Sequence, residues 1–348
     1  MSAHTAIIAA LVSALLFGAS TPFAKLLLGD VPPILLAGLL YLGSGLGLTL
    51  LRLARDRSLV APRLTSREWP WLLGAIVSGG VLAPVLLMYG LTRTSAANAS
   101  LLLNLEAVFS ALLAWIVFRE NADRRVVLGM ALIVAGGAIL AWSPGALPGG
   151  AVFGGVAIAG AGLCWGLDNN LTRKVAASDA LFIAAIKGLV AGITNCALAL
   201  ALGDALPPPA LVGAAMSVGL LGYGLSLVLY ILALRGLGSA RASAYFSTAP
   251  FLGAAVAILV LHEPAASAFW LSALLMAAGV WLHLSERHEH EHGHEAQTHE
   301  HPHVHDEHHQ HQHDVAWDGG EPHSHLHHHQ PLRHRHHHYP DLHHRHRH

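Results

Sequence analysis

Residues 96–118 form a continuous apolar run, AANASLLLNLEAVFSALLAWIVF, in which Glu106 is the one ionisable side chain. A helix rises about 1.5 Å per residue, so about 20 residues cross the hydrocarbon core of a bilayer, which is roughly 30 Å thick. This run is long enough to do so. Because backbone polar groups in lipid must be satisfied within the segment, the run is expected to be a helix and not an isolated strand.

Similar runs fill the chain on both sides of this segment, up to residue 284. We mark ten of them, at residues 5–28, 33–53, 70–92, 96–118, 126–142, 153–172, 181–202, 211–234, 241–261 and 265–284. Pro and Gly lie between them, as in Pro207-Pro208-Pro209, because these residues end helices and form short turns. The sequence predicts an all-α membrane protein with ten transmembrane helices embedded in a lipid bilayer.

The composition excludes several classes of protein. Of the 348 residues, 53% are hydrophobic and only 12% are charged, whereas a soluble domain carries roughly 25% charged residues. A soluble enzyme is therefore not expected. The chain has no phosphate-binding loop of the form Gly-x-x-x-x-Gly-Lys-Ser/Thr, so we expect no ATP-driven transport. We also expect no enzymatic activity, no required cofactor and no nucleic-acid binding.

The membrane region consists of two related halves. A shift of 143 positions places Ala97-Asn98-Ala99-Ser100 on Ala240-Arg241-Ala242-Ser243, and Glu120 on Glu263. A shift of 148 places Phe17-Gly18 on Trp165-Gly166. Each half holds five runs, an odd number, so the second half enters the membrane inverted. Inverted repeats are typical of transporters, although gene duplication also produces channels and scaffold proteins.

These observations divide the chain into three parts. Residues 1–142 are predicted to form the first five-helix repeat and residues 143–284 the second. Residues 285–348 form a tail that holds 25 of the 28 histidines.

Arg and Lys residues orient the protein in the membrane. If the N-terminus is cytoplasmic, the inner loops and helix ends collect Arg52, Arg55, Arg57, Arg63, Arg67, Arg119, Arg124, Arg125, Arg173, Lys174, Arg235 and Arg241. The outer helix ends collect only Lys25 and Arg93. Positive charge accumulates on the cytoplasmic side of membrane proteins, so we expect both termini to be cytoplasmic. An oligomer is compatible with the sequence.

Two segments resemble the EamA-type proteins of the drug/metabolite transporter superfamily. The segment Tyr245-Phe246-Ser247-Thr248-Ala249-Pro250-Phe251-Leu252-Gly253, followed by Leu261-His262-Glu263-Pro264, is similar to the second half of such proteins. Leu103-Asn104-Leu105-Glu106-Ala107-Val108-Phe109 through Phe118-Arg119-Glu120 is similar to the first half. The resemblance implies a ten-helix inner-membrane carrier that exports small metabolites or toxic compounds, and it supplies no substrate. Ala107 stands where the family commonly has a proline, which removes the usual reason for a break in this helix.

Glu106 is the first candidate for a substrate or coupling site. It lies near the middle of its run, where an ionised side chain costs about 2.5–3.5 kcal/mol on insertion scales, so it should face the interior of the bundle. Removal from water disfavours the charged form, which would allow a proton to load and leave near neutral pH. Ser110 and Asn98 could border the same polar stripe. The alternative is a permanently hydrogen-bonded structural carboxyl.

A second cluster is predicted nearer the cytoplasmic side. Asp168 and Asn169 come late in the sixth run, and Lys187 comes early in the seventh, so Asp168 and Lys187 should lie at similar depth. We predict an ion pair between them, with either a structural role or a role in substrate contact. Trp165, one turn before Asn169, either anchors the protein at the membrane interface or lines a cavity.

The tail is expected to be disordered because it has no apolar periodicity that could build a core. Neutral imidazole is a good ligand for zinc, nickel and cobalt, so the tail is predicted to bind divalent metal. The candidate ligands are His288, His290, His292, His294, His299, His301, His303, His305, His308, His309, His311 and His313.

We therefore expect a secondary-active transporter that exports a small organic metabolite or drug by alternating access, with proton coupling. Two alternatives remain at this point. One is a nickel, cobalt or zinc exporter fed by the tail, and the other is a membrane metal sensor. The membrane region argues against metal export because it lacks a cluster of intramembrane His and Asp residues.

Overall fold

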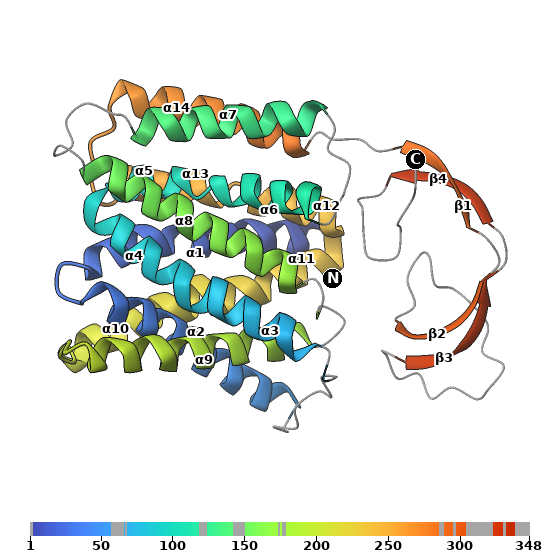
Figure 1. Ribbon diagram of the computed structural model, residues 1–348, viewed down its shortest axis with the longest axis horizontal. Coiled ribbons are helices and arrows are strands. Elements are labelled where there is room, and N and C mark those ends of the chain that lie inside the picture. The colour runs from blue at the N-terminus through green and yellow to red at the C-terminus, as the bar shows by residue number, and fades with distance from the viewer. Residues whose placement is uncertain are drawn as a thin grey trace. The chain divides into compact units, whose positions relative to one another are not determined.

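The computed structural model describes residues 3–56, 66, 68–117, 124–141, 150–172, 175 and 179–284, together with four segments of the tail. The chain divides into two compact units, Met1–Glu286 and Arg287–His348. The first unit, called the body below, is a bundle of roughly parallel and antiparallel helices (Figure 1).

The first half of the body runs from α1 to α7. Its elements are α1 (Ala3–Leu27), α2 (Pro33–Asp56), α3 (Trp69–Ala75), the π-helical segment η1 (Ile76–Leu82), α4 (Ala83–Arg93), α5 (Ala96–Leu102), α6 (Leu105–Ile116) and α7 (Arg124–Ala141). The second half consists of α8 (Gly150–Thr172), α9 (Ala180–Ala201), α10 (Pro209–Gly219), the π-helical segment η3 (Leu220–Leu225), α11 (Ser226–Leu237), α12 (Ser239–Phe246), α13 (Ala249–Leu259) and α14 (Ser267–Leu284).

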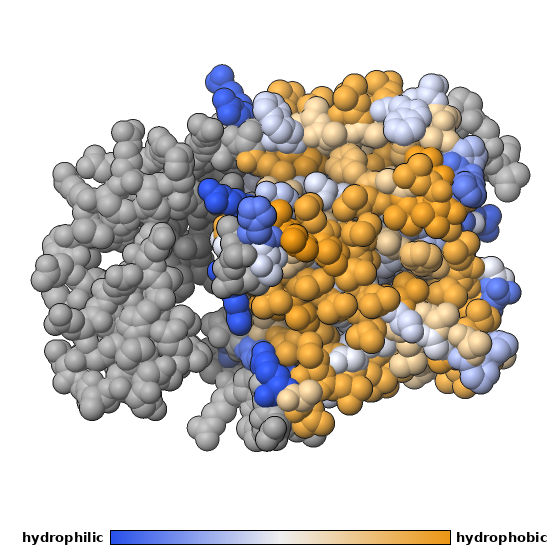
Figure 2. All heavy atoms as spheres, turned by 180° about the vertical axis from the view of Figure 1, so that it is seen from behind, coloured by the Kyte–Doolittle hydropathy of each residue, from blue (hydrophilic) through white to orange (hydrophobic). Residues whose placement is uncertain are grey.

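The helices confirm the predicted all-α membrane fold. Within the described part of the chain, nine helical stretches are long and apolar enough to cross a bilayer, and α8, of 23 residues, occupies the position of the predicted sixth run. Figure 2 shows a broad hydrophobic band on one side of the body, with hydrophilic residues towards its two ends. Leu259 and Ile116 are 73% and 70% exposed, as expected for side chains that face lipid.

Each half contains the same two irregularities at matching positions. The third span of each half is continuous through a π-helical segment, η1 in the first half and η3 in the second. The fourth span of each half is interrupted, at Leu103–Asn104 in the first half and at Ser247–Thr248 in the second. A shift of 143 positions places Asn104 on Ser247. The structure therefore repeats internally at a finer level than the sequence comparison predicts.

The break in the first half corrects an expectation. Ala107 in place of a proline put a break in this span in doubt, yet α5 and α6 are separate helices. At this point the backbone hydrogen bonds tighten to three-residue spacing: Asn104 N donates to the carbonyl oxygen of Leu101 at 3.0 Å, and Glu106 N donates to that of Leu103 at 3.1 Å. Asn104 Nδ2 adds a second hydrogen bond to the Leu101 carbonyl oxygen, 2.9 Å away. An Asn side chain that competes for a nearby backbone carbonyl in this way allows a helix to be interrupted without a proline.

The two halves interlock through equivalent helices. The first helix of each half packs against the fourth span of the other, so α8 contacts α6 and α1 contacts α13. Small residues permit both contacts. A Cβ added to Gly166 would lie 2.9 Å from Ser110 N, and one added to Gly18 would lie 2.2 Å from the carbonyl oxygen of Ala249. Gly162 packs closely at the same contact, because a Cβ added to it would lie 3.2 Å from Glu106 N.

The tail contains four short strands, which differ from the disorder expected for it at these segments. β1 (Glu289–His294) pairs antiparallel with β4 (Leu332–His337), and β2 (Gln297–His303) pairs antiparallel with β3 (His323–His329). Pairing of two strands satisfies backbone hydrogen bonds without an apolar core. The other tail residues lie outside the described residues.

Candidate functional site

The predicted ion pair between Asp168 and Lys187 is present inside the body. Lys187 Nζ lies 2.5 and 2.7 Å from the two carboxylate oxygens of Asp168. Thr172 Oγ1, one turn further along α8, donates to Asp168 Oδ1 at 2.9 Å. The pair therefore joins α8 to α9. Asp168 is only 6% exposed, and a buried charge of this kind is stable only when it is paired and hydrogen-bonded.

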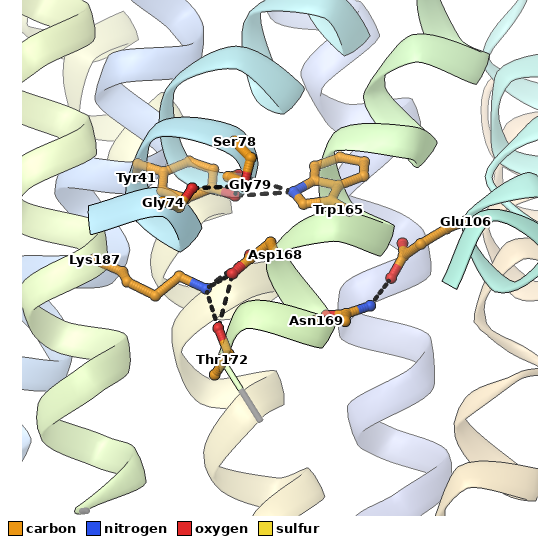
Figure 3. A network of polar contacts seen from close by, with 10 residues as sticks. All are labelled: Tyr41, Gly74, Ser78, Gly79, Glu106, Trp165, Asp168, Asn169, Thr172 and Lys187. Atoms are coloured by element: carbon orange, nitrogen blue, oxygen red, sulfur yellow. Dashed lines mark hydrogen bonds and ion pairs between the residues drawn. The ribbon is translucent and has the colours of Figure 1, made fainter. Parts of the chain in front are cut away.

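Gly79 makes room for this carboxylate. A Cβ at position 79 would lie 2.0 Å from Asp168 Oδ2, a distance that requires something to shift. Gly79 lies in the π-helical segment η1, and its carbonyl oxygen accepts hydrogen bonds from Tyr41 OH at 2.7 Å and Trp165 Nε1 at 3.0 Å. π-Helical turns leave carbonyl groups outside the regular ladder and are frequent at functional sites. Figure 3 shows these side chains converging from α2, η1 and α8.

Glu106 belongs to the same site. Asn169 Nδ2 donates a hydrogen bond to Glu106 Oε1 at 2.8 Å, and Figure 3 shows this pair beside the Asp168–Lys187 pair. Glu106 lies within electrostatic range of both Asp168 and Lys187. The sequence suggested two separate clusters, and the structure joins them, because Asp168 and Asn169 are neighbours that reach α9 and α6 respectively.

Asn169 faces away from the lipid although its side chain is exposed. Leu163 and Leu167 on the same helix are 45% and 39% exposed, as lipid-facing residues would be. Successive residues of a helix turn by about 100°, so Asn169 points about 200° away from Leu167. An exposed polar residue on that side indicates that the Glu106–Asn169 pair is accessible from within the bundle.

Trp165 lies in the interior and not at the membrane interface. It is 8% exposed, whereas Trp270 and Trp281 are 59% and 66% exposed. Its indole nitrogen also lies 3.3 Å from Tyr41 OH. Of the two interpretations of Trp165, the structure favours the interior one.

The remaining two predicted residues occupy different surroundings. Ser110 lies where α6 meets α8: its carbonyl oxygen accepts from Asn170 Nδ2 at 3.3 Å, and its buried hydroxyl has no hydrogen-bond partner among the described residues. Asn98 lies in the first turn of α5, where its backbone amide donates to Ser95 Oγ at 3.2 Å. Among the described residues, the hydrogen bonds of the site therefore include Ser110 and do not extend to Asn98.

Sequence reasoning missed Tyr41, Gly79 and Thr172. Tyr41 carries only one polar group, its hydroxyl, within an apolar run, and Gly79 is one of many glycines. Neither residue therefore stands out by its type. Thr172 could have been found, since it lies one turn from Asp168, and residues four apart on a helix are neighbours.

The predicted metal ligands remain a prediction. The side chains of the tail histidines lie outside the described residues. Within the described side chains, no group of three or more His, Cys, Asp or Glu residues could hold a metal ion.

A helix end outside this site is held by Glu263. Its two carboxylate oxygens accept hydrogen bonds from the amides of Ala96 and Ala97, at 2.9 and 2.8 Å. These amides begin α5, so a carboxylate from the second half caps a helix of the first. His262 has a positive φ of 54° and turns the chain just before Glu263. This contact gives Glu263 a structural role, and its repeat counterpart, Glu120, lies outside the described residues.

Comparison with known proteins identifies relatives of this chain. The pattern of the EamA-like transporter family matches residues 4–142 and again residues 152–285. An uncharacterized transporter of Methanothermobacter thermautotrophicus is 29% identical over 290 residues, which cover 79% of this chain and 84% of that protein. A probable 4-amino-4-deoxy-L-arabinose-phosphoundecaprenol flippase subunit, ArnE, of Pseudomonas aeruginosa is 38% identical over 110 residues, covering 31% of this chain and 93% of that protein.

A solved crystal structure has the same fold. It superimposes with a TM-score of 0.60 at 21% identity and covers 79% of this chain and 95% of that chain. At this identity the likeness concerns the fold alone.

Proposed function

Because this chain belongs to the EamA-like transporter family, we propose that its body exports a small organic metabolite or drug by alternating access, coupled to protons. The observation that carries this proposal is Glu106. Its carboxyl lies midway along the fourth span, on the interior of the bundle, and is held by the neutral amide of Asn169. An ionisable group at such a depth is expensive unless it has a function or a partner.

The Asn169 partner suits proton exchange. An amide both donates and accepts hydrogen bonds, so it can bind Glu106 as a carboxylate through its nitrogen and as a neutral acid through its oxygen. A cationic partner would instead favour the charged form alone. Glu106 can therefore change protonation state without losing its hydrogen bond, which supports a role in coupling.

The two interrupted spans support alternating access. In α5, all residues except Asn98 are buried, and α5 packs against α13 of the other half. Its inverted counterpart, α12, packs mainly against α11 and α1, and Ala242 is the one buried residue among its described side chains. Two elements that are equivalent in the repeat thus differ in burial. This difference supports a conformation that is closed at the face where α5 begins and more open at the face where α12 begins.

We assign the more open face to the cytoplasm. Arg52 and Arg55 lie on it and contact Asp179, and the positive-inside rule places the Arg-rich loops inside the cell. This orientation puts both termini in the cytoplasm and the body in the inner membrane. A site open to the cytoplasm is where an exporter would take up its substrate.

The experiment is transport by purified protein in proteoliposomes, with a panel of amino acids, drugs and divalent metals. Uptake of an organic solute should follow an imposed pH gradient, and Glu106→Gln should abolish that dependence. Asp30→Asn, a change at an exposed carboxylate in the α1–α2 loop, is the matched control and should transport as the wild type does. Organic solute transport that is indifferent to the pH gradient would contradict proton coupling.

We propose separately that the tail binds zinc, nickel or cobalt. β2 contains His299, His301 and His303. Their register partners in β3 are all histidines as well. A segment so rich in histidine would offer several imidazole ligands to one ion. Metal export has no comparable support in the body, so we propose metal binding without metal transport.

A further inference from the structure

The polar site has one more carboxyl than it has cations. Lys187 is paired with Asp168, and the contacts of the described residues give Glu106 an amide partner and no cation. With both carboxyls ionised, this site carries a net charge of about −1. A negative charge in a low-dielectric interior is stabilised by a proton or by a bound cation.

Aromatic rings continue the site across the interface between the two halves. Tyr41 of α2 lies 5.4 Å from Tyr223 of η3, measured between ring centroids, and Tyr223 lies 6.1 Å from Phe17 of α1. Phe17 in turn lies 5.3 Å from Phe246 of α12. Through the contact of Tyr41 with Trp165, these rings form one continuous chain of contacts, which we call the aromatic wall (Phe17, Tyr41, Trp165, Tyr223 and Phe246).

The aromatic wall and the surplus carboxyl are adjacent. Trp165 and Asn169 are four residues apart on α8 and therefore lie on the same side of the helix, and Asn169 holds Glu106. Tyr41 is within electrostatic range of both Asp168 and Glu106. Ring faces attract cations, by about 0.5–1 kcal/mol at exposed sites and about 2 kcal/mol or more where water is excluded.

The charge is confined to one side of the pseudo-symmetric centre. The repeat shift of 148 relates Asp168 and Asn169 to Ser20 and Thr21, and the shift of 143 relates Glu106 to Ala249. The equivalent place in the other half therefore has no carboxyl. A substrate at the centre would meet the carboxyls at one end of the aromatic wall, beside Trp165 and Tyr41, and uncharged rings at the other end.

We propose that the substrate is a monovalent organic cation, an ammonium compound carrying an aromatic or apolar group, whose charged end binds at Glu106 and whose apolar part lies against the aromatic wall. This rests on the proposed function and names its substrate class. Anionic solutes would be repelled by Glu106 and Asp168. Because a proton and a cation would neutralise the same carboxylate, they would compete, and exchange of one for the other moves no net charge across the membrane.

The test uses three probes that share a benzyl group and differ in charge. Benzyltrimethylammonium is a permanent cation, N-acetylphenylalaninamide is neutral and N-acetylphenylalanine is an anion. Binding to the full-length purified protein is measured by isothermal titration calorimetry. We expect the cation to bind at least about tenfold more tightly than the neutral probe, which corresponds to about 1.4 kcal/mol, and its binding to weaken as pH falls.

Variants test each half of the proposal. Glu106→Gln should remove the preference for the cation, and Phe246→Leu should weaken cation binding at least about threefold while the protein remains monodisperse. Tyr89→Leu, an exposed ring on α4, is the control and should bind as the wild type does. If Glu106→Gln fails to fold, the affinity of Phe246→Leu for the cation and the pH dependence of cation binding to the wild type still test the proposal.

The outcomes separate this inference from the proposed function. Binding of the cation no tighter than that of the neutral probe, or no binding of any probe, overturns the assignment of substrate class. In that case pH-driven transport of a neutral or zwitterionic solute from the panel would leave the proposed function standing. The absence of any pH-driven organic solute transport would overturn both.

Discussion

Replacing Lys187 alone by Met should destabilise the protein far more than replacing Lys187 and Asp168 together by neutral residues. The charges are separated by 2.5 and 2.7 Å, which at an effective dielectric of about 20 corresponds to an attraction of about 6 kcal/mol. Desolvation costs several kcal/mol for each ion and offsets most of this attraction. Removing one partner leaves the other charge buried, at a cost of about 3–5 kcal/mol.

The assay is thermal unfolding in one detergent, followed by circular dichroism, for the wild type, Lys187→Met, Asp168→Asn and the double variant. A loss of about 3–5 kcal/mol should lower the apparent Tm by roughly 10 °C, given about 2–4 °C per kcal/mol for large domains. The double variant should recover most of this loss. Asp179→Asn, in a partly exposed pair with Arg52 at 3.2 Å, is the control and should cost about 1 kcal/mol or less.

Additive effects would refute this reasoning. If the shift in Tm of the double variant equals the sum of the two single shifts, the two charges are not coupled. Transport by the folded double variant then distinguishes the roles of the pair: retained transport indicates a structural pair, and lost transport indicates contact with substrate or coupling ion.

Three further predictions follow from particular contacts. Glu263→Ala should remove the cap of α5 and lower the free energy of unfolding by about 1–2 kcal/mol. It should also increase the labelling, from the face where α5 begins, of a cysteine placed at position 97. Unchanged labelling would contradict a role of Glu263 in closing that face. Gly166→Leu should separate α8 from α6 and cost at least about 1–3 kcal/mol, whereas Gly213→Ala, with no atom within 4 Å of the added Cβ, should not reduce the melting temperature. Deleting residues 287–348, a separate compact unit, should leave the melting temperature of the body unchanged and abolish zinc binding measured by calorimetry. Zinc binding to the full chain should weaken as pH falls through about 6.5, because imidazole is then protonated.

The predicted helices came from a property that sequence displays directly. A membrane-spanning helix must be apolar over a fixed length, so the ten runs could be marked residue by residue. The two halves were also visible, because Gly18 and Gly166 match in sequence and both turn out to make close contacts between the halves. The ion pair between Asp168 and Lys187 was predicted from their similar depth in the membrane, because two buried opposite charges at one depth are stabilised by pairing.

What sequence did not reveal depends on backbone irregularity and on the tertiary arrangement. At the break before Leu105, both the backbone amide and the side chain of Asn104 bond the Leu101 carbonyl, and an Asn in an apolar run does not by itself predict such a break. The π-helical segment η1 aims the Gly79 carbonyl at Tyr41 and Trp165, which no periodicity predicts. The union of Glu106 with the Asp168 cluster required the packing of α6 on α8, a contact between halves that are far apart in sequence.

The central claim is that one interior site, at Glu106 and Asn169, is reached from one face of the membrane at a time. A single cysteine at position 169, with Cys164 and Cys196 replaced by Ala, tests it most directly in sealed vesicles of both orientations. A membrane-impermeant thiol reagent should modify this cysteine from the N-terminal face at rest, and from the opposite face when an imposed pH gradient drives the protein to its other state. Modification from both faces under one condition, as in a channel, or from a single face under every condition, would contradict the account.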